Sequence, residues 1–95
     1  MAFSARQIVR ELYGGRLYEY YPIGQHIVAA PGVCGGRPTF KYTRLEVATI
    51  LDLLAAEWTV EQLVHEYTQS RLTTEAITEA VRLDKLGTII PVRSH

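Results

Sequence analysis

The residue types that could carry out catalysis or bind a metal are few and scattered in this chain. It has a single cysteine, Cys34, and its three histidines are His26, His65 and His95. A catalytic thiolate needs an activating base and an oxyanion site nearby, and zinc sites are usually built from closely spaced Cys and His pairs. Neither pattern occurs, so we expect no catalytic residue, no metal site and no cofactor. The sequence favours a protein that is not an enzyme.

The segment Gly35-Gly36-Arg37 invites comparison with a phosphate-binding loop. The nucleotide-binding signature Gly-x-x-x-x-Gly-Lys-Ser/Thr is missing, and the glycines are not followed directly by a helix. Two adjacent glycines are also typical of a tight turn. We therefore interpret this segment as a turn in front of the helical part of the chain, not as a nucleotide site.

Basic side chains concentrate in the first half of the chain. Residues 1–44 contain six Lys or Arg and two acidic residues, a net charge of +4, whereas residues 45–95 contain four and eight, a net charge of −4. The first half would attract a polyanion such as double-stranded DNA. The two halves could instead neutralise each other within the fold or across a dimer. Six residues form the candidate nucleic-acid site: Arg37, Lys41, Arg44, Arg71, Thr73 and Thr74.

The tyrosines suggest a second kind of surface. Three of them, Tyr18, Tyr20 and Tyr21, cluster in one short segment, and tyrosine is enriched in protein interfaces. We expect residues 17–30 to provide a homodimer or partner contact by strand pairing along an exposed edge. The alternative is that these rings cover the small core. The candidate interface residues are Tyr18, Tyr20, Tyr21 and Ile27.

We predict a short helix in the N-terminal third of the chain, in front of these tyrosines. Ser4 and Gln7 form a capping box, and Gly14-Gly15 is a suitable helix end. Ile8, Val9, Leu12 and Tyr13 would then form one apolar face. The β-favouring residues from 17 to 30 predict a small antiparallel hairpin that turns at residues 23–26.

Three further helices are predicted after the Gly- and Pro-rich segment. Capping boxes at Thr43/Glu46 and Thr59/Gln62 open the first two, Thr73 caps the third, and Gly87 ends it. We expect Glu75 and Glu79 on the exposed face of the third helix, where they would repel phosphate. The prediction is a mainly α protein, a three-helix bundle of helix-turn-helix type with an N-terminal helix and a β hairpin. It forms a single domain, 1–95, made of residues 1–30 (helix and hairpin), 31–42 (loop) and 43–87 (tri-helical core).

Length and composition limit the class of protein. A chain of 95 residues with 47% hydrophobic residues is enough for one small domain, and small domains often gain buried area by dimerising. No apolar run approaches the ~20 residues of a membrane helix, and the N-terminus is not a signal peptide. A single cysteine fits a reducing compartment. We expect a cytoplasmic protein that does not associate with membranes.

Several stretches resemble the bacterial family known as domain of unknown function 433, a predicted antitoxin family. The stretches are Pro31-Gly32-Val33-Cys34-Gly35-Gly36-Arg37-Pro38-Thr39-Phe40-Lys41-Tyr42-Thr43-Arg44-Leu45, Ile50 to Leu63, and Leu72-Thr73-Thr74-Glu75-Ala76-Ile77, within residues 27–84. The resemblance implies a homeodomain-like three-helix core. It also implies a non-catalytic antitoxin that binds a cognate toxin, usually as a dimer, and its own promoter DNA. A pure protein-interaction module without DNA binding stays open as the alternative.

Two positions depart from the family pattern. The family usually has glycine where this chain has Tyr42 and again where it has Glu57. Glycine is the residue that adopts positive φ without steric cost. Either the backbone does not need positive φ at these positions, or it adopts positive φ and is strained.

Overall fold

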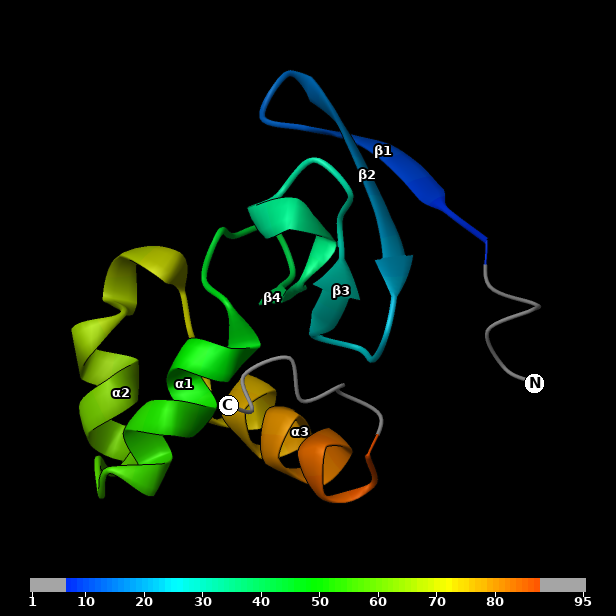
Figure 1. Cartoon of the computed structure of the whole chain (residues 1–95). Coiled ribbons are helices and arrows are strands. Elements are labelled where there is room, and N and C mark those ends of the chain that lie inside the picture. Colours follow the sequence, from blue (N-terminus) through cyan, green and yellow to red (C-terminus); the bar gives the residue numbers. More distant parts are fainter. Residues whose placement is uncertain (1–6, 88–95) are drawn as a thin grey trace.

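The computed structural model describes residues 7–87, which form an antiparallel sheet and three α-helices (Figure 1). The strands are β1 (Val9–Tyr13), β2 (Arg16–Pro22), β3 (Ile27–Ala29) and β4 (Pro38–Phe40), in the spatial order β1-β2-β3-β4. The helices are α1 (Val47–Ala55), α2 (Val60–Glu66) and α3 (Thr74–Lys85). Two short 3₁₀ turns, η2 (Cys34–Gly36) and η3 (Thr68–Ser70), lie in the connections. No helix in residues 7–87 is both long enough and apolar enough to cross a bilayer.

The predicted N-terminal helix is wrong where the structure describes it. Residues Val9–Tyr13 form β1, which pairs with β2 from Val9↔Tyr20 to Tyr13↔Arg16. Gly14 and Gly15 form a two-residue hairpin loop with φ of 62° and 78°. A tight hairpin of type I′ requires positive φ at both central residues, so the glycines serve a strand turn rather than a helix end. Ser4, the proposed helix cap, lies outside the described residues.

The mainly α fold class is also wrong, because the sheet has four strands instead of one small hairpin. The hairpin predicted over residues 17–30 exists as the β2–β3 pair, with Tyr21 opposite Ala29. Residues 31–42 are not only loop, since β4 pairs with β3 at Ile27↔Phe40 and completes the sheet. The molecule is therefore an α+β domain in which sheet and helices share the core.

Side-chain caps explain where two of the three helices, α2 and α3, begin. The Thr59/Gln62 capping box of α2 is present in both directions, and the Thr73 side chain accepts a hydrogen bond from the Ala76 N–H of α3. The predicted capping box at Thr43 and Glu46 is wrong. The Thr43 hydroxyl instead bonds to the Leu45 N–H and the Phe40 carbonyl, and α1 begins later, at Val47.

The core has two parts, one on each face of the sheet. The larger part packs Ile27 and Phe40 of the sheet against buried residues of all three helices, including Ile50, Leu63 and Ile77. A second, smaller cluster contains Tyr20, Val28 and Ala30. In Figure 1 the helices lie below and to the left of the sheet, and the β1–β2 hairpin extends at the top. The sheet thus links the helical core to the tyrosine-rich hairpin.

A buried carboxylate joins α3 to the β2–β3 loop. Glu79 was predicted on the exposed face, but only 6% of it is exposed. Its two carboxylate oxygens accept hydrogen bonds from the Gln25 and His26 N–H groups, each at 2.7 Å. A Cβ at Gly24 would lie 2.6 Å from the Glu79 carboxylate, so only glycine allows this close approach. Glu79 therefore holds the loop and is not part of a DNA-facing surface.

Both positions that depart from the resemblance, Tyr42 and Glu57, adopt positive φ. The φ angle is 69° at Tyr42 and 75° at Glu57, so the interpretation that the backbone is strained there is the correct one. Glu57 follows the end of α1, where its N–H donates to the Leu54 carbonyl and the Trp58 N–H donates to the Leu53 carbonyl. This is a Schellman motif, in which glycine is the favoured left-handed residue.

Replacing Glu57 with glycine is expected to raise the free energy of unfolding by about 1 kcal/mol. The left-handed conformation costs an ordinary residue roughly 1–2 kcal/mol, and part of the gain is offset by the greater entropy of glycine in the unfolded chain. Urea denaturation measures the change. The matched control is Ala56→Gly, because Ala56 is also exposed but has an ordinary φ of −89° and should lose stability. A loss at both positions would contradict the assignment of strain to Glu57.

Candidate nucleic-acid interface

A cleft of about 940 Å³ opens between the turn after β4 and the connection from α2 to α3. Three cationic side chains line it, Lys41, Arg44 and Arg71, and so does the α3 cap Thr73. No carboxylate is among the described residues that line the cleft. The structure therefore brings four of the six candidate nucleic-acid residues to one concave surface.

On the sheet side of the cleft, hydrogen bonds hold the backbone of Lys41 and Arg44 in place. The Lys41 N–H donates to the His26 carbonyl at 2.8 Å, and the Cys34 thiol donates to the Arg44 carbonyl at 3.3 Å. Arg71 comes from the other wall, where it ends η3 in a left-handed conformation with φ of 57°. Neither Arg44 nor Arg71 forms an ion pair with a carboxylate of residues 7–87. Both guanidinium groups are available to an anionic ligand.

Two tyrosines form an aromatic wall of the same cleft. The Tyr13 and Tyr42 rings stack with centroids 4.3 Å apart and planes 16° from parallel. Besides this stacking, two hydrogen bonds hold Tyr42: its hydroxyl donates to Glu11 at 2.5 Å, and its N–H donates to the Tyr18 hydroxyl at 2.9 Å. These contacts keep Tyr42 in place despite its strained backbone. The rings remain accessible, with 47% of Tyr13 and 37% of Tyr42 exposed.

Two charged side chains next to the aromatic wall, Lys41 and Glu11, have pKa values shifted by the neighbouring tyrosines. The Lys41 ammonium lies 5.0 Å from the Tyr20 ring centroid and 5.1 Å from that of Tyr42. A hydrogen bond with Tyr20 raises the pKa of Lys41, so this cation keeps its charge. Hydrogen bonds from Tyr42 and Tyr20 lower the pKa of Glu11, and the bond to Glu11 raises the pKa of Tyr42. Glu11 offsets part of the Lys41 charge, which leaves Arg44 and Arg71 as the main attraction for an anion.

The other two candidate residues lie outside the cleft. Arg37 forms a two-pronged ion pair with Glu46, both bonds being 2.9 Å long. This pair raises the pKa of Arg37 and lowers that of Glu46. Thr74 is exposed in the first turn of α3 but does not line the cleft. Arg37 is thus paired with Glu46 in front of α1 and lies outside the lining of the cleft.

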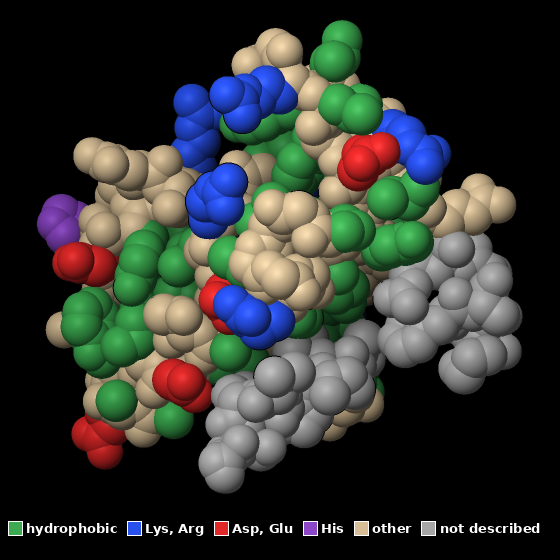
Figure 2. Space-filling model, turned by 45° about the horizontal axis from the view of Figure 1, so that its top comes forward, with side chains coloured by type: hydrophobic (Ala, Val, Ile, Leu, Met, Phe, Trp, Pro, Cys, Tyr) green, Lys and Arg blue, Asp and Glu red, His purple; other side chains and the backbone are tan. Residues whose placement is uncertain are grey.

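Internal ion pairs neutralise only part of the basic half of the chain. Of the three ion pairs found among the described residues, only Arg37–Glu46 joins a cation of residues 1–44 to an acidic residue of the second half. On the face shown in Figure 2, Lys and Arg side chains gather toward the upper part and most acidic side chains lie lower. The charge separation seen along the sequence thus persists in part on the surface.

The candidate interface residues are partly or fully covered by the rest of the chain. Tyr20 and Ile27 are buried, and Tyr18 and Tyr21 are half-buried. Strand β2 pairs with β1 along its first part and with β3 at its end. Within the described residues, the strand at this edge of the sheet is β1. The exposed apolar residues nearby are its Leu12 (78% exposed) and the cross-strand neighbour Leu17.

The family comparison covers most of this interface. The sequence model of a family described as protein of unknown function, DUF433, matches residues 27–82. The chain belongs to this family. Neither a curated protein nor a solved structure matches the chain. The family range contains the cations and Tyr42, whereas the β1–β2 hairpin, with Glu11 and Tyr13, precedes it.

The aromatic wall was not among the features predicted from the sequence. With Gly14-Gly15 taken as a hairpin turn, strand alternation places Glu11, Tyr13, Tyr18 and Tyr20 on one face, and this signal would have revealed the cluster. Tyr42 gave a weaker signal, a bulky residue at a position that departs from the resemblance. In the described residues no group of His, Cys, Asp or Glu is arranged to hold a metal ion.

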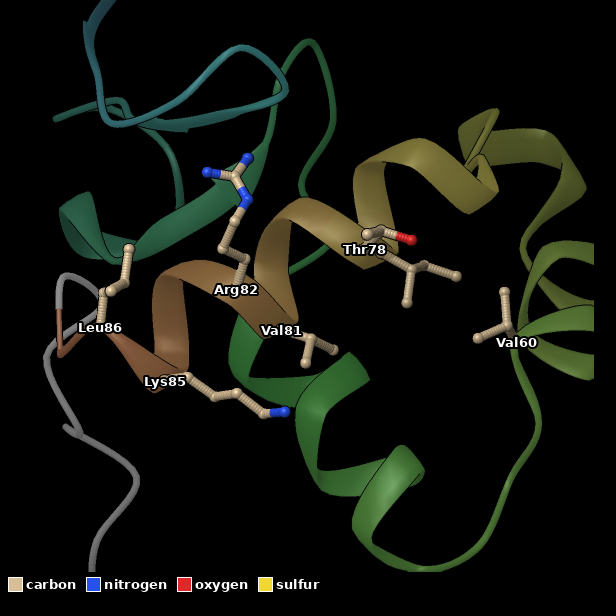
Figure 3. Close-up of a pocket in the computed structure, with 7 residues that line it drawn as sticks. Val60, Thr78, Val81, Arg82, Lys85 and Leu86 are labelled. Carbon is tan, nitrogen blue, oxygen red and sulfur yellow. The ribbon is translucent and has the colours of Figure 1, made fainter.

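A second hollow, of about 530 Å³, lies beside α3 (Figure 3). Its lining is mostly apolar and includes Val60, Ile77 and Val81, with Arg82 and Lys85 also contributing. Leu86 at the end of α3 is 69% exposed and lines the same groove. This groove is separate from the basic cleft, because the two share no lining residue.

Proposed function

We propose that the protein is a non-catalytic, antitoxin-like regulator that binds nucleic acid through the basic cleft. The observation that carries this proposal is the convergence of Lys41, Arg44 and Arg71, from two separate connections, on a cleft without a lining carboxylate. Proteins bind the sugar–phosphate backbone mainly through such cations, and binding then weakens as salt rises. The antitoxin role itself is suggested by the family resemblance.

The test is a titration of the purified protein with the DNA upstream of its own reading frame, at about 50 and 200 mM salt. Binding that is selective for this DNA and falls steeply with salt supports a regulator. An unrelated DNA of equal length is the control for selectivity. Absence of binding at both salt concentrations would remove the nucleic-acid part of the proposal.

An antitoxin also needs a surface for its toxin, and the apolar groove of Figure 3 supports this part of the proposal. Leu86→Asp would place a charge in the groove at a position so exposed that the fold should tolerate it. We expect this variant to lose co-purification with the product of the neighbouring reading frame, while Leu12→Asp, on the distant hairpin, retains it. Equal capture by both variants would exclude the groove as the toxin-binding surface.

The alternative is a protein-interaction or dimerisation module without nucleic-acid binding. Its specific support is the pair Leu12 and Leu17, which are directly opposite each other and largely exposed on the outer face of the hairpin. Sedimentation of the wild type and of a variant with serine at both positions distinguishes a dimer built on this face from a monomer.

A further inference from the structure

The basic cleft combines two features that phosphate binding alone does not require. Its cations would hold a backbone, but its wall also exposes the stacked rings of Tyr13 and Tyr42. In double-stranded nucleic acid the faces of the bases are covered by their neighbours, so a ring can stack only on an unpaired or extruded base. Surfaces that bind single strands combine a basic groove with such aromatic platforms.

We propose that the cleft binds a single-stranded segment of nucleic acid, with one unpaired base stacked on the Tyr13–Tyr42 pair. This inference rests on the proposed function, because it names the form of nucleic acid that the same cleft accepts. The phosphates on either side of the stacked base would meet Arg44 and Arg71.

The construction of the aromatic wall favours this role over simple core packing. Tyr42 occupies a strained left-handed backbone position, yet more than a third of the residue is exposed. Contacts with Glu11, Tyr18 and Tyr13 hold the ring in a fixed orientation. Backbone strain maintained by several neighbours is a recurrent feature of binding sites. A ring fixed in advance loses little entropy when a base stacks on it.

The position of Tyr13 adds a separate argument. It ends β1 at the tip of a hairpin, where a solvated polar residue would satisfy the turn equally well. Its ring instead turns toward the cleft and stacks on Tyr42, on the face of the strand opposite to Leu12. The hairpin thus brings a second ring to a cleft whose cations belong to the family range.

The experiment compares three ligands of one sequence and about ten nucleotides: a single DNA strand, the corresponding RNA strand and the DNA duplex. We expect a single strand to bind wild-type protein at least about 10-fold more tightly than the duplex, and the RNA and DNA arms identify which strand is preferred. Tyr13→Ala should weaken single-strand binding by roughly 5- to 100-fold and leave duplex binding unchanged. Tyr13→Phe, which keeps the ring, should restore it.

Leu12→Ala is the matched control, since it shortens the neighbouring exposed side chain on the opposite face of β1. Tyr13→Leu keeps an apolar side chain without an aromatic face and should bind as weakly as Tyr13→Ala. Duplex binding equal to single-strand binding, with no effect of Tyr13→Ala, would overturn the inference but leave the proposed function intact. Failure of all three ligands to bind would overturn both.

Discussion

Replacement of Glu79 by alanine is expected to lower the free energy of unfolding by about 3 kcal/mol. The carboxylate is almost fully buried and accepts hydrogen bonds from the backbone N–H groups of Gln25 and His26, both at 2.7 Å. A hydrogen bond to a charged group contributes roughly 1.5–3 kcal/mol, and its removal leaves a donor without a partner. Urea denaturation, analysed for both midpoint and slope, measures the loss.

Two further variants separate the hydrogen bonds from general effects on α3. Glu79→Gln keeps one carbonyl acceptor without the charge and should lose about half as much stability. Glu75→Ala is the matched control, because it removes an exposed glutamate from the first turn of the same helix and should cost about 0.5 kcal/mol. Similar losses at Glu75 and Glu79 would contradict the role assigned to the buried carboxylate.

The contact between Glu79 and the β2–β3 loop also affects the basic cleft. The β2–β3 loop that Glu79 holds includes His26, whose carbonyl in turn accepts the Lys41 N–H. His26 and Lys41 both line the cleft. A buried acidic residue on α3, predicted to repel phosphate, therefore positions one of the cations that would attract it.

The helical half of the fold was predictable because its signals are local. At α2 the side chains of Thr59 and Gln62 cap the helix within four residues, and at α3 Thr73 does the same. Such caps form in the helix end itself and depend little on the remainder of the chain. The prediction failed at Thr43 and Glu46, which have the same spacing, because α1 begins only at Val47. Glu46 is therefore the residue before the helix, and its side chain pairs with Arg37.

The N-terminal strand was not predictable from its own residues. Val9, Leu12 and Tyr13 fit the spacing of a helix face, and the charged Glu11 between Val9 and Tyr13 breaks the apolar/polar alternation that would indicate a strand. The choice depends on partners elsewhere in the chain: Tyr20 across the hairpin, and Tyr42 beyond two more strands, both bonded to Glu11. Sheet contacts of this kind are long-range, so a short window of sequence does not contain them.

The sequence predicted which residue types could form the candidate site, but not which of them the fold brings together. Lys41, Arg44 and Arg71 were selected for charge alone, and the fold places them together because the turn after β4 faces the α2–α3 connection. Arg37 met the same criterion, yet Glu46 pairs with it. A net charge along the sequence thus indicates where a polyanion is attracted, whereas the ion pairs decide which cations are available.

Removal of two cleft cations, as Arg44→Gln with Arg71→Gln, is expected to weaken binding of the preferred nucleic acid by roughly 30- to 100-fold at low salt. Each lost phosphate contact should also reduce the slope of log affinity against log salt by about 0.7 to 0.9. Neither arginine has a carboxylate partner in residues 7–87, so the fold should be unaffected by their loss of charge. Titrations at several salt concentrations provide both quantities.

The matched control is Arg37→Gln with Lys85→Gln, which removes the same amount of charge outside the cleft. If long-range attraction by net charge dominated, both double variants would lose affinity and salt dependence equally. If the cleft is the binding site, the control should lose no more than about 3-fold, because neither side chain lines the cleft and Arg37 is already paired with Glu46. Equal losses would therefore exclude the cleft and leave only a diffuse basic surface.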